Sequence, residues 1–576
     1  MNGNISEIGI TRDLEAMKRV GCSGFQIFQV GSGIPKGPVD YGSPEHIRLL
    51  QHTAREANRL GLEFAMHNCP GWSSSGGPWI TARPEYSMQN LTWTETPVAG
   101  GQRVNVTLPR PVARLNFYRD AMVLAFPAVA GETAQPVRIT SNSGPVDAKL
   151  LAGDPAGGVE IRSATDGTAF LQLEFAEPVE ARSVALISAA IAADAGGRGR
   201  GGAGGGGRGS PGGGGALSIE ASDDGAQFRK IADLPAGGAG GRGGGGGGGA
   251  AAAGGPQLPT TVNIPATRAK YFRLVSTEPR RVSALRVSAA PRIVNWTAKA
   301  HFTPGGGGGG RGGPAVQAAP PVEPSGPFVD PASVLDISQS MNQQGQLNWQ
   351  APAGNWIVLR IGHTTNGVEN HPSPDGGGGL EVDKFSAEAY DYHFNQFFGK
   401  LLDAIAPLTS KGLAASIIDS YETGVQNWTV KFPEEFQKRR GYDLKKYMPA
   451  MFGRVVGSPQ VSDRFLWDVR KTQAELMQEN YYGRFQEDLH KHGMRSFIEP
   501  YSPGNFDEMP TGNYADMVMG EFWQGRAVHH SVKLVASIGH IYDKKIIGAE
   551  SFTAQSKWQE HPYSLRPSGT SCTPRG

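Results

Sequence analysis

Five acidic side chains stand at or near the ends of short apolar runs in the second half of the chain. Asp419 and Glu422 follow one such run, and three later runs end at or near a glutamate, namely Glu499, Glu521 and Glu550. Carboxylates that face one another across a cleft suit glycoside hydrolysis, which needs one protonated acid and one charged base or nucleophile. A structural ion pair is the simpler interpretation of any single one of them, but their repetition favours chemistry.

The elements that would position these acids alternate between strands and helices. Segments 25–30 and 62–68 have the composition of strands, and segment 43–60 between them carries apolar residues at helical spacing after a Ser-Pro start. The same alternation returns after residue 364. We therefore predict an α/β fold, an incomplete (β/α)8 TIM-type barrel whose catalytic residues lie at the carboxyl ends of its strands.

Polar and aromatic side chains follow the second predicted strand. His67 and Asn68 end that strand, and Trp72 stands in the loop of small residues behind it. This loop is either a sugar-binding lip or a surface loop pinned by its tryptophans, and His67 is either a substrate contact or a neutral structural histidine. Trp428 and Trp523 lie near the same predicted rim, where each is either a platform for a sugar ring or a packing residue.

The middle of the chain follows a different pattern. Between residues 91 and 363 helical periodicity gives way to short β-type runs, which predict a large inserted β-sandwich. Within it, segment 218–228 and the Tyr-Phe-Arg-Leu-Val run at 271–275 resemble galactose-binding-like modules.

Glycine-rich tracts interrupt this insert at 196–215, 237–255 and 305–313. Such tracts bury too little apolar area to offset chain entropy, so we expect disordered loops. An RNA-binding Gly/Arg segment is the alternative, although the tracts lack interleaved aromatic residues.

The overall composition excludes several classes of partner. The chain has 55 Lys and Arg against 53 Asp and Glu, which gives no reason to expect nucleic acid or an anionic membrane surface. It has no apolar run of about 18 residues that would span a membrane. Three cysteines are too few for a disulfide framework or a four-cysteine zinc site. The oligomeric state does not follow from the sequence.

Four motifs together resemble glycoside hydrolase family 106, the α-L-rhamnosidases. They are His67-Asn-Cys-Pro-Gly-Trp72, Gly379-Leu-Glu-Val-Asp-Lys384, Asp419-Ser-Tyr-Glu422 and Gly548-Ala-Glu550. The resemblance extends from the start of the chain to about residue 565, apart from the glycine tracts. It implies removal of terminal α-L-rhamnose from polysaccharides or glycosides with inversion at the anomeric carbon.

The resemblance also implies roles for particular residues. Glu422 would be the general acid and Glu550 the base that activates water, with about 6.5–9.5 Å between the two carboxyl groups. On one strand the side chains of Asp419 and Glu422 would point to opposite faces, so only one of them could face the cleft. A bend at the rim could admit both, so Asp419 is the reserve acid.

A calcium ion that helps to hold the sugar is a further implication of the family. Calcium prefers six to eight oxygen ligands, and the candidates are Glu499, Glu521 and Asp383. The family also implies a periplasmic or secreted parent protein, although a signal peptide is absent from the start of this chain.

These expectations divide the chain into four parts. They are barrel segment 1–90, the β-sandwich insert 91–363, barrel segment 364–565, and a tail at 566–576 that looks non-native and non-helical. The first and last barrel strands are expected to be missing. A catalytically inactive carbohydrate-binding fragment and a retaining glycosidase of another sugar remain as alternatives.

Overall fold

The computed structural model describes most of the chain outside the glycine-rich tracts. The described residues are 1–83, 86–151, 153, 157–162, 168–191, 216–235, 258–303, 322–405, 408, 413–502, 504–524, 530–554 and 559–572. The tracts that we predict to be disordered lie outside these residues.

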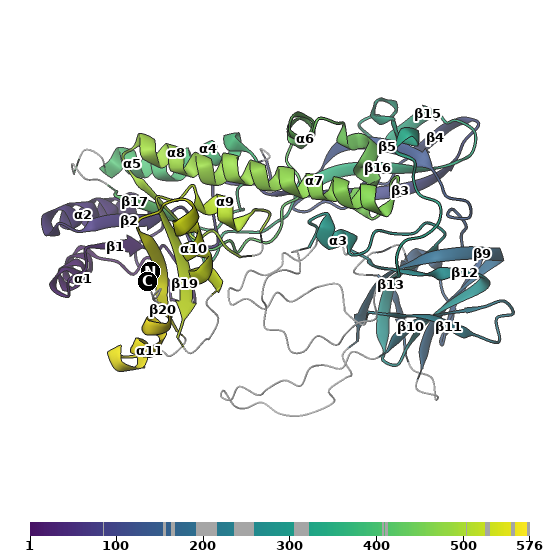
Figure 1. The fold of residues 1–576 in the computed structure, drawn as a ribbon, viewed down its shortest axis with the longest axis horizontal. Helices are drawn as coiled ribbons and strands as arrows, with labels where there is room; N and C mark the ends of the chain where they lie inside the picture. Colours follow the sequence, from purple (N-terminus) through teal and green to yellow (C-terminus); the bar gives the residue numbers. More distant parts are fainter. Residues whose placement is uncertain are drawn as a thin grey trace.

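A six-stranded parallel sheet forms one end of the molecule (Figure 1). Its strands stand side by side in chain order: β1 (Gly24–Ile27), β2 (Glu63–His67), β17 (Ala415–Ile418), β18 (Arg495–Ile498), β19 (Met517–Trp523) and β20 (Ile547–Thr553). Every neighbouring pair is parallel. The predicted α/β class is confirmed, and the sheet amounts to part of a barrel. Among the described residues, β1 and β20 each pair on one side only.

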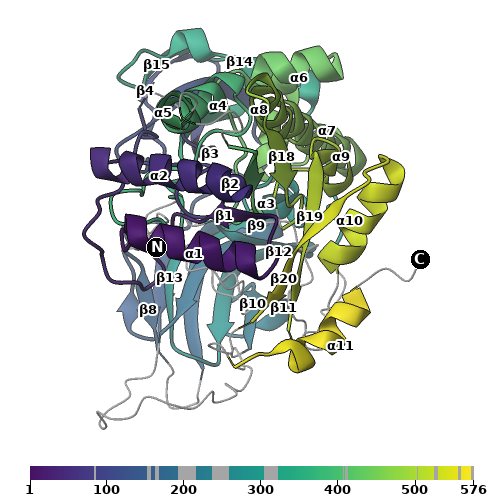
Figure 2. The same cartoon turned by 90° about the vertical axis from the view of Figure 1, so that its left-hand side faces the viewer.

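Helices alternate with the strands in sequence, and α2 packs on β2 and α10 on β19 and β20, while α1 lies beside α2 (Figure 2). The helices of this part are α1 (Glu7–Arg19), α2 (Pro44–Leu60), α4 (Ala387–Phe394), α5 (Lys400–Ile405), α6 (Phe432–Arg440), α7 (Pro459–Met477), α8 (Arg484–Lys491), α9 (Glu508–Gly512) and α10 (His530–Ile541). In α2 the Ser43 hydroxyl caps the first turn, and Gly61 ends the helix with a φ of 64°, which suits glycine. None of the described helices combines the length and the apolar character of a membrane span.

Antiparallel sheets occupy the opposite end of the long axis, and α7 runs along that axis between the two ends (Figure 1). The first group comprises β3 (Gln89–Ala99), β5 (Arg119–Pro127), β14 (Leu335–Asp336) and β16 (Asn355–Thr365), with the separate pair β4 (Arg103–Thr107) and β15 (Gln346–Gln350). The second group is an eight-stranded sheet of β6 (Arg138–Ser141), β7 (Gly144–Pro145), β8 (Val159–Ile161), β9 (Ala169–Ala190), β10 (Leu217–Ser222), β11 (Arg229–Leu234), β12 (Thr260–Ser276) and β13 (Arg280–Ser288), which encloses a core of its own. The short helix α3 (Trp296–Lys299) follows β13.

The tail differs from its prediction. Residues Pro562–Cys572 form a helix, α11, whereas the loss of apolar periodicity predicts a non-helical segment. Local hydrogen bonds hold it instead, because the Ser564 hydroxyl accepts from the His561 amide at 3.0 Å. Gln524, just after β19, donates to the Ser564 carbonyl at 2.7 Å and accepts from the Ser568 hydroxyl at 2.6 Å. The last four predicted tail residues lie outside the described part of the chain.

A buried ion network joins the helical part of the molecule to β3. Arg454 is 2 % exposed, donates to Glu95 of β3 at 2.6 Å and also contacts the Glu132 carboxylate. Burial by itself would raise the pKa of Glu95, but Arg454 and Arg292 outweigh it and lower that pKa to about 2. The carboxylate therefore depends on its arginine partners to remain charged.

Arg454→Met is expected to lower the free energy of unfolding at pH 7 by about 3–5 kcal/mol, because it leaves two buried carboxylates without their main cation. In the wild-type protein, the stability from Glu95 is present above its unfolded pKa and is lost as the pH falls toward about 2. The difference between wild type and variant should therefore shrink on acidification, which urea unfolding at pH 7 and pH 4 measures. Arg48→Met is the control, since Arg48 forms only exposed ion pairs. Equal losses in the two variants would contradict the assignment.

Candidate active site

Three carboxylates converge at the carboxyl ends of the parallel strands. Asp419 and Glu499 are the residues directly after β17 and β18, and Glu550 lies within β20. Oxygen atoms of the three side chains all lie within 4.8 Å of one another. Parallel strands end at the same edge of a sheet, so acids at equivalent positions are brought together.

The electrostatics of this cluster are dominated by burial. Asp419 and Glu499 are 8 % and 2 % exposed, and burial raises the pKa of both carboxyl groups. The charge of Asp419 raises the pKa of Glu499 further, whereas the hydrogen bond between the two groups opposes the rise in the pKa of Asp419. The charge of Glu550 raises both pKa values further, while the Tyr501 hydroxyl donates to Glu499 Oε2 at 2.5 Å. Two carboxylates this close either share a proton or bind a cation.

Glu422 stands beside this cluster in the loop after β17. Burial raises the pKa of its carboxyl group, and the charge of Glu550 adds to the rise, whereas His371 and Trp72 oppose it. A raised pKa favours the protonated form of a carboxyl group, which is the form that acts as a general acid. The alternation of a strand does not apply to Asp419 and Glu422, because β17 ends at Ile418 and both residues lie beyond it. The charge of Glu422 raises the pKa of Asp419.

The polar residues after β2 lie deep in the structure. His67 is buried, which lowers its pKa to about 3 and keeps it neutral, and its Nε2 lies 2.6 Å from Gln26 Nε2 and 3.8 Å from Asp419 Oδ2. Asn68 donates to the Ser75 hydroxyl, and its carbonyl lies 2.9 Å from His393 Nε2. His67 therefore borders the carboxylate cluster, while Asn68 holds the loop that follows.

The three candidate tryptophans have different environments. Trp72 is half-buried and meets Phe28 edge to face. Trp523 is also half-buried, and its indole donates to the Glu521 carboxylate. Trp428 is 3 % exposed and packs in the main core against Phe432, so it offers no face to a sugar. The proposal of Trp428 as a sugar platform is thus corrected.

The structure groups the candidate metal ligands differently from the sequence expectation. Glu499 belongs to the cluster with Asp419 and Glu550, and Glu521 is the register partner of Glu550 on the neighbouring strand. Asp383 is not in this cluster. Its carboxylate accepts from the Thr429 hydroxyl at 2.6 Å, the Phe385 amide at 2.9 Å and the Gln426 amide.

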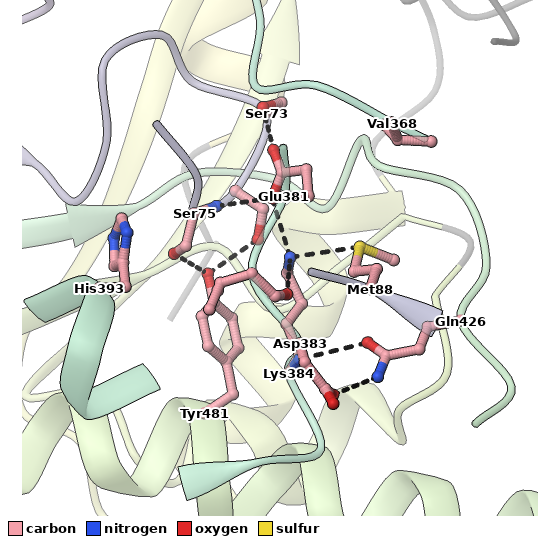
Figure 3. A network of polar contacts seen from close by, with 12 residues as sticks. Ser73, Ser75, Met88, Val368, Glu381, Asp383, Lys384, His393, Gln426 and Tyr481 are labelled. Atoms are coloured by element: carbon pink, nitrogen blue, oxygen red, sulfur yellow. Dashed lines mark hydrogen bonds and ion pairs between the residues drawn. The ribbon is translucent and has the colours of Figure 1, made fainter. Parts of the chain in front are cut away.

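A buried ion pair, absent from the candidates above, supports the loop after β2 (Figure 3). Lys384 Nζ lies 2.9 Å from Glu381 Oε2, and both side chains are fully buried. Glu381 also accepts from the Ser73 hydroxyl at 2.6 Å and from the Ser75 amide at 3.0 Å. Burial would raise the pKa of Glu381, but Lys384 and these donors lower it. The sequence signals for the pair are an acid and a lysine three residues apart and their place in the Gly379-Leu-Glu-Val-Asp-Lys384 motif of the family resemblance.

Several carboxylates at or near the carboxyl ends of parallel strands, with Glu422 among them at a raised pKa, define the kind of site that glycoside hydrolases use. The model of the α-L-rhamnosidase family, glycoside hydrolase family 106, matches residues 1–574. The chain therefore belongs to this family.

Two relatives extend the comparison. A solved structure of a rhamnosidase from Novosphingobium sp. PP1Y is 31 % identical, superposes with a TM-score of 0.77, and is matched over 98 % of this chain and 52 % of its own. A Formosa agariphila protein provisionally named a beta-glucuronidase is 31 % identical over 570 residues, which are 99 % of this chain and 35 % of that protein. The chain thus spans about a third to a half of these relatives.

Lys384→Met is expected to lower the free energy of unfolding by about 3–5 kcal/mol, because the fully buried Glu381 carboxylate loses its cation. Adding Glu381→Gln should recover part of that loss by removing the unpaired charge. Chemical denaturation of the single and double variants measures both effects. Lys431→Met, which breaks an exposed pair with Glu388, is the control and should change stability little. A double variant that is no more stable than Lys384→Met would contradict the pairing.

Proposed function

We propose that the protein is a glycoside hydrolase that removes terminal α-L-rhamnose from polysaccharides or glycosides with inversion. The observation that carries this proposal is the pairing of a buried Glu422, whose pKa is raised, with the nearby charge of Glu550. Family membership supports the sugar. An inverting enzyme needs one carboxyl group that delivers a proton and a second that activates water.

Glu422 is the proposed general acid. Burial favours its protonated form, and its Oε2 is buried without a partner among the described residues, so it is ready to donate to a glycosidic oxygen. Glu550 is the proposed base. It is half-buried, which leaves a path for water, and the Thr553 hydroxyl holds its Oε1 at 2.8 Å. Asp419 remains the reserve acid.

The sugar would lie against the loop after β2. His67 borders the acids, and Asn68 Oδ1 is a second buried oxygen that lacks a partner within the described chain. Trp72 and Trp523 are half-exposed aromatic residues suited to stacking on a pyranose ring. Asn68 is fully buried, so its proposed part in sugar binding is to hold this loop through its bond to Ser75.

A calcium ion fits the Asp419, Glu499 and Glu550 cluster. Two of these carboxylates are buried, burial raises both pKa values, and the charge of Glu550 adds to both, so a divalent cation would be stabilised there. Asp419 and Glu499 would hold it from the carboxyl ends of the neighbouring strands β17 and β18, with Glu550 and Glu521 nearby. When bound, calcium supplies positive charge and coordination sites for sugar hydroxyls.

Three further features, two of the fold and one of cellular location, complete the proposal. The six-stranded sheet would be part of a closed TIM-type barrel, and the eight-stranded sheet would be a galactose-binding-like β-sandwich. A periplasmic or secreted location would bring the protein to polysaccharide substrates. A retaining hydrolase, or one acting on glucuronides as the name of the Formosa agariphila protein states, is the alternative.

Glu550→Gln and Glu422→Gln are each expected to lower kcat on an aryl α-L-rhamnoside by about 10²–10⁴-fold, because each removes a proton-transfer group. Glu422→Gln should lose less on a substrate whose leaving group needs no protonation, whereas Glu550→Gln should lose equally on both. Release of the aryl group measures the rate, and proton NMR of the first-formed anomer reports inversion or retention. The exposed Glu388→Gln serves as control. First formation of the retained anomer, or activity on β-glucuronides alone, would contradict the proposal.

Chelation of calcium is expected to abolish most rhamnosidase activity, and added calcium to restore it, because the ion would hold the sugar through Asp419 and Glu499. Calorimetric titration of chelated protein with calcium should show one site, which Glu499→Gln weakens. Full activity in chelator together with no heat of binding would remove calcium from the proposed site.

A further inference from the structure

Ser73 connects the buried ion pair to the proposed general acid through its side-chain hydroxyl and its backbone carbonyl. Its hydroxyl donates to Glu381 Oε1 at 2.6 Å and accepts from the His371 amide at 3.0 Å. Its carbonyl accepts from the Glu422 amide at 3.0 Å. One residue thus joins the ion pair, the His371 segment and the backbone of Glu422.

The Glu381–Lys384 pair, to which the Ser73 hydroxyl bonds, is held firmly by its surroundings. Glu381 and Lys384 are fully buried, and the Lys384 ammonium also donates to the Val382 carbonyl at 3.3 Å. Its nitrogen lies 5.8 Å and 5.4 Å from the ring centroids of Tyr421 and Tyr481. Both side chains are fully buried and each also bonds to other groups of the protein, so the pair is held in place from several sides.

The same loop carries the side chains that set the environment of Glu422. Trp72 precedes Ser73, and the amides of both residues donate to the His371 carbonyl, at 3.1 Å and 3.0 Å. His371 and Trp72 are two of the neighbours that oppose the rise in the pKa of Glu422 caused by burial, and the Ser420 hydroxyl is another. The positions of His371 and Trp72 therefore bear on the protonation of the acid, and both depend on Ser73.

We propose that the Glu381–Lys384 pair is a positioning device for the general acid and acts through Ser73, which holds Trp72, His371 and the Glu422 backbone in one fixed arrangement. This proposal rests on the assignment of Glu422 as the acid. Ser73, Glu381 and Lys384 are positioning residues, since none of them is placed against the substrate.

Ser73→Ala tests the device, because it removes the bonds to Glu381 and to the His371 amide while the carbonyl bond to Glu422 can persist. We expect kcat to fall about 10-fold or more, since small misplacements of catalytic groups are costly. The general acid must be protonated, so activity declines as the pH rises through its pKa. Weaker contacts from Trp72 and His371 should raise that pKa and move the high-pH limb upward by about half a unit or more.

The matched control is Ser74→Ala. In the wild-type protein the Ser74 hydroxyl lies 2.8 Å from the Tyr481 hydroxyl and does not bond to Glu381. It should leave the high-pH limb in place. A second pair, Ser73→Thr and Ser73→Val, compares a hydroxyl with a methyl group at similar size, and only the threonine variant should retain the wild-type limb. Circular dichroism and thermal melts establish that each variant is folded.

A direct readout separates this proposal from the proposed function. Difference infrared spectroscopy of the protonated carboxyl stretch, with Glu422→Gln as reference, follows the titration of Glu422 without any turnover. A higher pKa of Glu422 in Ser73→Ala than in Ser74→Ala supports the positioning role of Ser73, even if the wild-type protein releases no rhamnose. An unchanged titration in folded Ser73→Ala and Ser73→Val overturns it, even if wild type is an active rhamnosidase.

Discussion

The concentration of negative charge at one edge of the parallel sheet constrains the rest of this structure. Asp419, Glu499 and Glu550 are held together partly out of water, where like charges repel strongly. Such a cluster persists only if the strands that carry it are fixed by other interactions. The main core beneath the sheet and the helices packed on it supply that rigidity.

The chain uses two kinds of buried charge for different purposes. Arg454 with its glutamates and Lys384 with Glu381 are compensated pairs, in which each carboxylate has a cation. Asp419 and Glu499 at the strand ends have raised pKa values chiefly because they are buried, and within the described chain no lysine or arginine forms an ion pair with either. A buried carboxylate that is paired with a cation stays charged and can support the structure. A buried carboxyl group without such a partner has a raised pKa and can gain or lose a proton, which is what acid–base catalysis requires.

Sequence patterns predicted the sheet and the acids well because both depend on local signals. An apolar run that stops at a carboxylate indicates a strand end, and parallel pairing brings such ends together, as with Asp419 and Glu499. Trp428 was misjudged because nearness to the rim in sequence does not determine which way a side chain packs. The helix at Pro562–Cys572 was missed because it is held by hydrogen bonds to Gln524 rather than by an apolar face. Ser73 and Glu381 lie 308 residues apart, so no local pattern could pair them.

That separation in sequence has a consequence for folding. The bond between Ser73 and Glu381 closes a loop that contains all the antiparallel strands from β3 to β16. Contacts between residues so far apart in the sequence form after local contacts, since the entropy of loop closure must be overcome first. The environment of Glu422 is therefore completed only when the two ends of the antiparallel region have come together. Each doubling of the loop adds only about 0.6 kcal/mol to its closure, so the region between these two residues can grow in evolution at little cost to the site.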